Sequence, residues 1–430
     1  MKIKQIAAVL LSAAALTITF AACGSNNEST CDHFYKISDG KCIYCGEEHP
    51  HEWNDGKCID CGYVCVHSTH NPVTMLCDNC GKERFHDYRS DNGGKCTMCN
   101  ETSSYEHYAI PEEYRKSCEH KGTIEKVIYS TYSYTYDKLK GNPEGTTAIE
   151  KDMYVYLPYG YTAGKKYNVL YLFHGSTGSQ SAWFGLNGYK SSPVQTIIPT
   201  IIDNLIYKRD MAETIIVTPT YYPIIANTDK NPLGSEDEET MGLGYGEYQF
   251  TVDFYKELKN AIIPTVETKY STYADCYGKT VEETVAEDFT SSRRHRAMAG
   301  LSMGSITTWE SGLLQSTDYI STFGCYAAAI TTVQNTGINN TPEETTEYIV
   351  DKLNEKFSGY TIDFLYSGTG TAESHDPYQK GLIKALINDD SDWFTAENTV
   401  HISKLDKVHN YEAWTIDLYN SLKYCFFKNV

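Results

Sequence analysis

The chain has 430 residues, with 37 Lys and Arg against 56 Asp and Glu, and a formal net charge of −19. This length allows two or three domains. No block of basic residues stands out, so nucleic acid is excluded as an expected partner, because phosphate binding requires grouped Lys and Arg side chains. Acidity of this size is typical of a soluble protein outside the cell.

The first residues predict export. MKIK is followed by the apolar, small-residue-rich stretch IAAVLLSAAALTITFAA, which is typical of a signal peptide over residues 1–22. Phe20, Ala21 and Ala22 directly before Cys23 resemble a bacterial lipobox, although the usual Leu of that motif is Phe20 here. The resemblance implies lipidation of Cys23, with residues 23–30 as a polar tether to a cell surface. A plain signal peptide is the alternative.

Residues 31–120 form a Cys/His-rich region. Each of four units has a Cys or His, then a His two residues later, and then a Cys-x-x-Cys pair; the last unit has Arg84 in place of its first ligand. Such pairs aim two sulfurs at one point, and a second pair completes the tetrahedron that Zn²⁺ prefers. The candidate ligands are Cys31, His33, Cys42, Cys45, His49, His51, Cys58, Cys61, Cys65, His67, Cys77, Cys80, His86, Cys96 and Cys99.

These units resemble zinc-ribbon-like repeats, and the zinc would be structural because four protein ligands leave no open position for water. The fourth ligand of the last unit could be Cys118, His107 or His120, or that site could be degenerate. A disulfide scaffold is the alternative, since exported proteins favour disulfides. The recurring His favours metal, because disulfides need no imidazole at a fixed spacing.

Residues 121–430 alternate apolar runs with helical stretches, which predicts an α/β domain with a mostly parallel central sheet. Residues 152–161 predict an edge strand, and 167–176 a buried parallel strand. A helix over 250–270 contains Pro264 as a kink or boundary. The remaining predicted strands are 213–221, 296–300, 361–370 and 399–406, and the remaining predicted helices are 305–316 and 411–427.

The stretch RAMAGLSMGS contains Gly300, Ser302 and Gly304 between a predicted strand and a predicted helix. That context is the one a Gly-x-Ser-x-Gly nucleophile elbow requires, because a sharp turn exposes the Ser hydroxyl at the helix N-terminus. Ser302 is therefore the candidate nucleophile. The backbone N–H of Met303 is one predicted oxyanion donor, and that of Ser176 or Thr177, after Gly175, is the second.

The general base and the acid follow the nucleophile in chain order in this type of fold. Three His follow Ser302, and only His409 lies in the predicted loop between the last strand and the last helix. His401 alternates within a strand and is expected to be packed. Asp376, in the loop after 361–370, is the preferred acid, with Asp406 and Glu373 as alternatives.

The segments AGLSMG, FHGSTGSQSAW, SGTGTAESHD and VHNYEAW together resemble carbohydrate esterase family 1, the esterases that include feruloyl esterases and acetyl xylan esterases. The resemblance spans about residues 121–430 and implies an α/β-hydrolase fold. It carries the nucleophile over to Ser302 and the base to His409. Asp376 matches less well, because its loop is longer than the family's Gly-x-x-Asp spacing, and Ser305 replaces a Gly.

The resemblance also implies an activity: hydrolysis of feruloyl or acetyl esters on plant polysaccharide such as xylan, by a lipid-anchored extracellular enzyme that needs no cofactor for catalysis. Two alternatives remain open. One is a peptidase or acyltransferase on the same fold. The other is a non-catalytic cell-surface binding protein, because folds of this type also serve for binding.

Overall fold

The structure is a computed structural model, and it describes residues 109–139, 141–186, 193–223, 245–330, 341–404 and 406–428, together with four short strands nearer the N-terminus. The chain divides into two compact units, Met1–His86 and Asp87–Val430. Within the described residues, no helix is both long and apolar enough to cross a membrane.

The four short strands form two hairpins. β1 (Trp53–Asn54) pairs antiparallel with β2 (Lys57–Cys58), and β3 (Tyr88–Arg89) pairs with β4 (Lys95–Cys96). β2 and β4 each end at the first Cys of a Cys-x-x-Cys pair. The predicted signal peptide, Cys23, the tether and the side chains of all predicted metal ligands lie outside the described residues.

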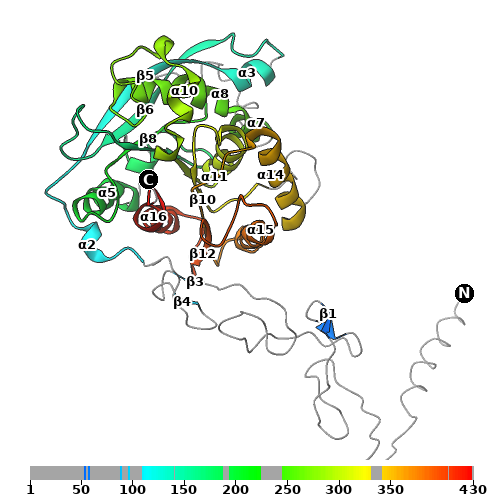
Figure 1. The fold of residues 1–430 in the computed structure, drawn as a ribbon. Coiled ribbons are helices and arrows are strands. Elements are labelled where there is room, and N and C mark those ends of the chain that lie inside the picture. Colours follow the sequence, from blue (N-terminus) through cyan, green and yellow to red (C-terminus); the bar gives the residue numbers. More distant parts are fainter. Residues whose placement is uncertain are drawn as a thin grey trace, which may run out of the picture. The chain divides into compact units, whose positions relative to one another are not determined.

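An eight-stranded sheet is the framework of the larger domain, with strand order β12-β11-β10-β9-β7-β8-β6-β5 (Figure 1). The six strands from β12 to β8 are parallel, whereas β6 and β5 run antiparallel to their neighbours. The strands are β5 (Thr123–Tyr132), β6 (Ala148–Leu157), β7 (Asn168–Phe173), β8 (Thr214–Thr218), β9 (Arg296–Leu301), β10 (Thr322–Tyr326), β11 (Phe364–Gly370) and β12 (Thr399–Lys404).

Helices cover both faces of this sheet. Two core clusters result, and successive residues of β7 alternate between them: Val169, Tyr171 and Phe173 in one, Leu170 and Leu172 in the other. This is the period-2 pattern of a strand buried on both faces. One cluster includes residues of α2 (Glu112–Arg115), α5 (Ile198–Tyr207) and α16 (Tyr411–Asn420), which lie together in Figure 1.

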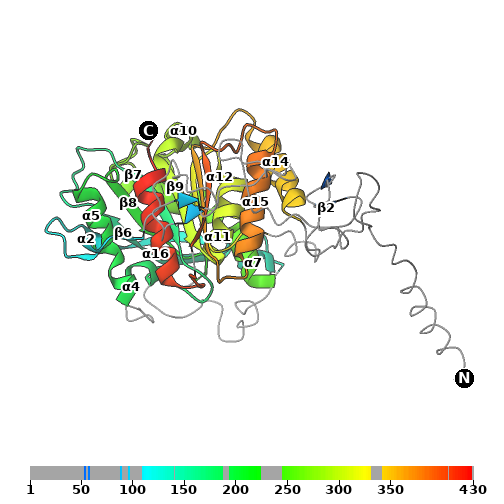
Figure 2. The same ribbon diagram turned by 90° about the horizontal axis from the view of Figure 1, so that it is seen from below.

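The second cluster includes residues of α7, α9, α14 and α15 and of the helix that follows β9. Figure 2 shows the domain from below, with α15 and α16 in front of the sheet. The bounds on this side are α7 (Tyr245–Asp253), α8 (Tyr255–Glu257), η4 (Leu258–Ile262), α9 (Ile263–Lys269), α11 (Met303–Thr307), η7 (Thr308–Leu313), α12 (Leu314–Ser316), α14 (Pro342–Phe357) and α15 (Asp376–Asn388). The shorter elements are α3 (Tyr134–Leu139), η2 (Ala182–Phe184), α4 (Pro193–Thr196), η5 (Val281–Glu283), α10 (Ala286–Thr290), η6 (Arg293–His295) and η8 (Ser421–Cys425).

The predicted α/β class with a mostly parallel sheet is confirmed, and the predicted strands and helices each overlap an observed one. The edge-strand prediction for 152–161 is wrong, because β6 pairs on both sides and β5 forms the edge. Strands β5 and β10 were not predicted. Pro264 lies in the first turn of α9, where a missing N–H costs nothing, and the helix continues through it.

The packed domain begins before the predicted boundary at residue 121. Ile110 and Tyr114 belong to a core cluster, and the Asn204 side chain of α5 donates to the carbonyl oxygens of Tyr114 and Lys116 at 3.0 and 2.8 Å. Cys118 is a buried free thiol. Residues 110–118, assigned by the sequence to the Cys/His region, are thus part of the α/β domain.

Candidate active site

Ser302 lies in a strained turn between β9 and α11. Its φ is 54° and its ψ is −119°, in a region that non-glycine residues rarely occupy. A Cβ on Gly300 would lie 2.4 Å from the Gly304 backbone, and a Cβ on Gly304 would lie 2.5 Å from the carbonyl oxygen of His174. Both glycines are therefore required by close approach, as the predicted nucleophile elbow demands.

The hydroxyl of Ser302 meets His409. Ser302 Oγ lies 3.0 Å from His409 Nε2, although the two residues are 107 positions apart in sequence. His409 directly precedes α16, whose N-cap is Asn410, with the Asn410 Oδ1 accepting from the Ala413 N–H at 3.1 Å. The Trp414 ring, one turn into α16, packs edge-on against the imidazole at 4.8 Å between centroids. The helix start therefore fixes the orientation of the His409 ring.

Glu373 is the carboxylate that contacts the imidazole. Its Oε2 lies 2.8 Å from His409 Nδ1, and its side chain is only 1% exposed. The other oxygen, Oε1, accepts the Gly370 N–H at 2.9 Å, while the Glu373 N–H donates to the Gly370 carbonyl oxygen. A carboxylate at Nδ1 fixes the tautomer that leaves Nε2 free to accept a proton from Ser302.

Asp376, the predicted acid, faces away from His409, which is a correction to the prediction. It is the first residue of α15, and its Oδ1 accepts hydrogen bonds from Thr369 Oγ1 and, at 2.6 Å, from Ser403 Oγ. His401 Nε2 lies 3.7 Å from the same oxygen. Burial alone would raise the pKa of Asp376, but these hydrogen bonds outweigh it and lower the pKa well below its usual value.

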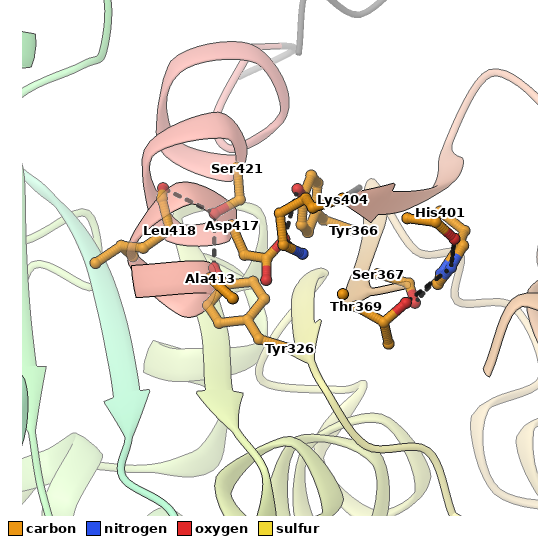
Figure 3. A network of polar contacts seen from close by, with 12 residues as sticks. Tyr326, Tyr366, Ser367, Thr369, His401, Lys404, Ala413, Asp417, Leu418 and Ser421 are labelled. Atoms are coloured by element: carbon orange, nitrogen blue, oxygen red, sulfur yellow. Dashed lines mark hydrogen bonds and ion pairs between the residues drawn. The ribbon is translucent and has the colours of Figure 1, made fainter. Parts of the chain in front are cut away.

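The helix start explains the difference between the two carboxylates. A residue at the first position of α15 points its side chain at the neighbouring strand ends, whereas Glu373 lies in the tight turn after β11, whose carboxylate reaches the next loop. The sequence did hold a signal, because Gly370 and Glu373 have the Gly-x-x-acid spacing that Asp376 lacks. His401 is packed as predicted, since Ser367 Oγ contacts its Nδ1 at 2.9 Å (Figure 3).

The loop after β7 lies beside the nucleophile. A Cβ on Gly175 would come 3.2 Å from the Ser302 Cβ, so only glycine allows this approach. Of the two predicted donors in this loop, the Thr177 N–H donates to the Tyr222 hydroxyl at 3.1 Å. Met303 is the first residue of α11, so its N–H has no acceptor within the helix. Ser176 and Met303 are thus the better candidates for an oxyanion hole.

His174 anchors the same loop from below. Burial lowers the pKa of His174 to about 4, so the ring is neutral at physiological pH. Its Nδ1 lies 2.7 Å from the Gly175 carbonyl oxygen and its Nε2 lies 2.8 Å from Thr220 Oγ1. Nδ1 must therefore be the donor, which leaves Nε2 to accept from the Thr220 hydroxyl.

A cleft of about 650 Å³ opens over Ser302 and His409. Its volume is in the range of small-molecule sites. Trp414 contributes to its wall, but Trp183 and Trp309 are fully buried core residues and Trp393 is buried beneath the surface. The lining residues are Gly175, Ser176, Thr177, Gly178, Val194, Gln195, Leu301, Ser302, His409, Asn410, Tyr411, Glu412 and Trp414.

No cluster of three or more potential metal ligands occurs among the residues that the structure describes. Two of the alternative ligands for the last Cys/His unit fall within them. The Cys118 thiol donates to the His120 carbonyl oxygen at 3.6 Å, and the His120 ring packs between Tyr159 and Tyr207. His107 lies outside the described residues.

Fold and site together define an α/β-hydrolase with a Ser-His-Glu constellation at the carboxyl ends of its parallel strands. Residues 146–321 match the family described as "Putative esterase". The solved feruloyl esterase module from Clostridium thermocellum, an alanine mutant complexed with sinapinate, is 25% identical and superposes with a TM-score of 0.56, covering 76% of this chain and 98% of that one.

Two curated relatives carry further domains. Endo-1,4-beta-xylanase Y of Acetivibrio thermocellus is 27% identical over 63% of this chain, and an endo-1,4-beta-xylanase/feruloyl esterase of Xylanibacter ruminicola is 29% identical over 45%. The chain spans about a fifth of the length of each, 19% and 20%. The described α/β domain is accordingly a carboxylic ester hydrolase of the feruloyl esterase-like type.

Proposed function

We propose that this protein is a serine esterase that hydrolyses feruloyl esters on plant cell-wall polysaccharide such as xylan, with acetyl esters as the second candidate substrate. The observation that carries the proposal is the contact chain Ser302–His409–Glu373, with distances of 3.0 and 2.8 Å, at the base of an open cleft. Glu373 takes the role that the sequence assigned to Asp376.

Acylation follows from this geometry. His409 Nε2 accepts the proton of Ser302 Oγ as the oxygen attacks the ester carbonyl carbon, and the C–O bond to the sugar breaks as His409 returns the proton to the leaving alcohol. Glu373 holds the Nδ1–H and stabilises the imidazolium that forms. The oxyanion would be bound by the N–H groups of Met303 and Ser176, and each such donor contributes about 10²–10³-fold in rate.

Deacylation uses the same groups in reverse order. A water molecule takes the place of the alcohol, His409 accepts its proton, and the hydroxide attacks the acyl carbon on Ser302. The acid is released as the proton returns to Ser302 Oγ. The residues that touch the reacting atoms supply every proton transfer, so no cofactor takes part in the steps described.

The cleft supports an aromatic acyl group. Tyr411 and Trp414 line it, with ring centroids 5.2 Å apart at 80°, and Leu301 and Val194 add apolar surface. A feruloyl ring would bury its faces against these side chains, whereas an acetyl group would leave most of the cleft filled with water. The relatives named for feruloyl esterase activity and the sinapinate complex support the same choice.

The N-terminal segment supports a location outside the cell. We propose export by the signal peptide over residues 1–22, lipidation at Cys23 and structural zinc in the Cys/His repeats, with an anchored enzyme facing polymeric substrate. Stoichiometric zinc in the purified full-length protein, and hydrolysis unaffected by brief treatment with a chelator, are expected. Metal-free protein without titratable thiols in residues 24–120 would favour disulfides instead.

The experiment that tests the function is a substrate panel with wild type and Ser302→Ala. Methyl ferulate, feruloylated arabinoxylan fragments, acetylated xylan and a peptide amide separate the esterase from the peptidase alternative. We expect feruloyl esters to be preferred, and Ser302→Ala to lose about 10³–10⁶-fold in kcat. No turnover by wild type on any ester would favour a binding protein, and activity that survives in Ser302→Ala would overturn the assigned nucleophile.

A further inference from the structure

A buried ion pair lies beneath the acid and base of the site. Lys404 Nζ lies 2.6 Å from Asp417 Oδ1, and the two side chains are 1% and 0% exposed. The Tyr366 hydroxyl donates to the same oxygen at 3.0 Å. Figure 3 shows Asp417 projecting from α16 towards Lys404 and Tyr366. The sequence analysis singled out none of these three residues.

The backbone makes room for this pair. A Cβ on Gly368, in strand β11, would lie 2.0 Å from Asp417 Oδ1, so only glycine lets the carboxylate reach the sheet. A buried charge pair is seldom the most stable solution, because well-packed apolar residues of similar volume often serve stability equally well or better. Its presence here therefore calls for a role other than stability.

The position of the pair in the chain suggests that role. Lys404 is the last residue of β12 and Asp417 lies within α16, so the ion pair closes the segment that carries His409. Trp414, which packs against the His409 ring, lies one turn before Asp417 on the same helix. A rotation or shift of α16 would move both the N-cap next to His409 and its aromatic neighbour.

The same lysine is also joined to the Glu373 loop. The Lys404 carbonyl oxygen accepts the Thr371 N–H at 2.9 Å, and the Lys407 carbonyl oxygen accepts the Ala372 N–H at 3.2 Å. The Asp406 N–H donates to the Thr371 hydroxyl at 2.9 Å. These bonds tie the loop after β11 to the loop after β12, and Lys404 contributes to both by its backbone and its side chain.

We propose that Lys404, Asp417 and Tyr366 are positioning residues that hold the His409 and Glu373 loops in register with Ser302. This inference rests on the esterase function proposed above. The electrostatics are consistent with it. Burial raises the pKa of Asp417 to about 6, Lys404 opposes that rise, and the negative charge of Glu373 adds to it. Lys404 thus keeps Asp417 ionised so close to a second carboxylate.

The chain offers a matched control at the other end of the sheet. Arg296 pairs with Glu267, both 1% exposed, and the Tyr171 hydroxyl donates to Glu267 at 3.3 Å. Arg296 begins β9 whereas Ser302 follows its end, so this trio lies roughly 20 Å of strand away from the nucleophile. It has the same chemistry, a cation, a carboxylate and a tyrosine, without a link to the site.

The test compares the double variant Lys404→Met/Asp417→Asn with Arg296→Met/Glu267→Gln. Both remove an ion pair without leaving an unpaired charge. For the first we expect kcat, and the rate of phosphonylation of Ser302 by a small organophosphate, to fall about 10- to 100-fold at an unchanged KM. For the second we expect a lower melting temperature but kcat within about twofold of wild type per folded molecule.

A milder pair of variants covers the case in which a double variant does not fold. Tyr366→Phe is expected to lower kcat and the phosphonylation rate about two- to fivefold, and Tyr171→Phe less than about 1.5-fold. Equal losses in the two regions, or a loss that appears in KM alone, would overturn the proposal. Failure of the esterase function itself is seen separately, as wild type without turnover or as an active Ser302→Ala.

Discussion

The turn after β9 and the pair of loops after β11 and β12 bring functional groups to the same cleft in different ways. The turn needs only its own residues: two glycines allow the close backbone approach, and Ser302 takes a positive φ. The two loops depend on each other, because Glu373 and His409 meet only when backbone bonds between Thr371, Lys404 and Lys407 hold the loops together.

The comparison teaches that a nucleophile can be specified locally, while its acid and base are specified by a contact network. A local turn survives changes elsewhere, but a network transmits any loss to the imidazole. Substitutions should therefore have their effects in the acid–base loops even at residues that touch no substrate. The following experiments break or sharpen this contrast, from the largest effect to the smallest.

Glu373→Gln should produce the largest effect after loss of the nucleophile. An amide in place of the carboxylate can stabilise the wrong imidazole tautomer and cannot stabilise the imidazolium, so kcat is expected to fall about 10²–10⁴-fold. Steady-state kinetics on methyl ferulate measures it, and Glu373→Asp tests the reach of the carboxylate. A decrease of less than about threefold in Glu373→Gln would return the role of acid to another residue.

Gly370→Ala tests whether the two loops depend on one another. The added Cβ would lie 2.0 Å from the Lys407 carbonyl oxygen, which forces the loops apart. We expect a loss of about 10-fold or more in kcat together with about 1–3 kcal/mol of unfolding free energy, measured by urea titration. Gly359→Ala serves as a control of exposed glycine, because nothing lies within 4 Å of its Cβ, and it should leave kcat unchanged.

Tyr222→Phe tests the support of the loop beside the nucleophile. Thr177 has a φ of 58°, and its N–H donates to the Tyr222 hydroxyl, so loss of that acceptor should loosen the loop that carries Ser176. A decrease of about three- to tenfold in kcat, with little change in stability, is the expected result. Unchanged kinetics would show that the loop is held by His174 and Gly175 alone.

Asp376→Asn should have the smallest effect on activity, within about threefold, because Asp376 does not contact His409. Its effect is on stability: removal of a charged acceptor of three neighbouring donors should cost about 1–3 kcal/mol at pH 7. Urea unfolding of both proteins measures it. A loss of kcat as large as that of Glu373→Gln would contradict the assignment of the acid.

The pH dependence of that stability has a definite sign. The folded-state pKa of Asp376 lies below the unfolded value of about 3.9, so the unfolded chain binds the proton first as the pH falls. The contribution is complete above about pH 5 and is lost as the pH falls through about 4 and below. The difference in urea midpoint between wild type and Asp376→Asn should therefore narrow in acid.

The sequence by itself determined the α/β class, the elbow at Ser302 and the base at His409. Each depends on a short pattern: alternating apolar runs, two glycines around a serine, and a histidine between the last strand and the last helix. Such patterns act within a few residues, where sterics and hydrogen bonding leave few alternatives. The same short range explains why the side-chain chemistry of the predicted Cys/His repeats remains a prediction.

Tertiary structure alone decided between Glu373 and Asp376, placed β5 outside β6 at the sheet edge, and brought residues 110–118 onto the core. Two carboxylates three residues apart are equivalent in composition, and only the start of α15 turns one towards Ser403 and leaves the other facing His409. The direction of a side chain depends on which strands and loops pack against it, and no local pattern carries that information.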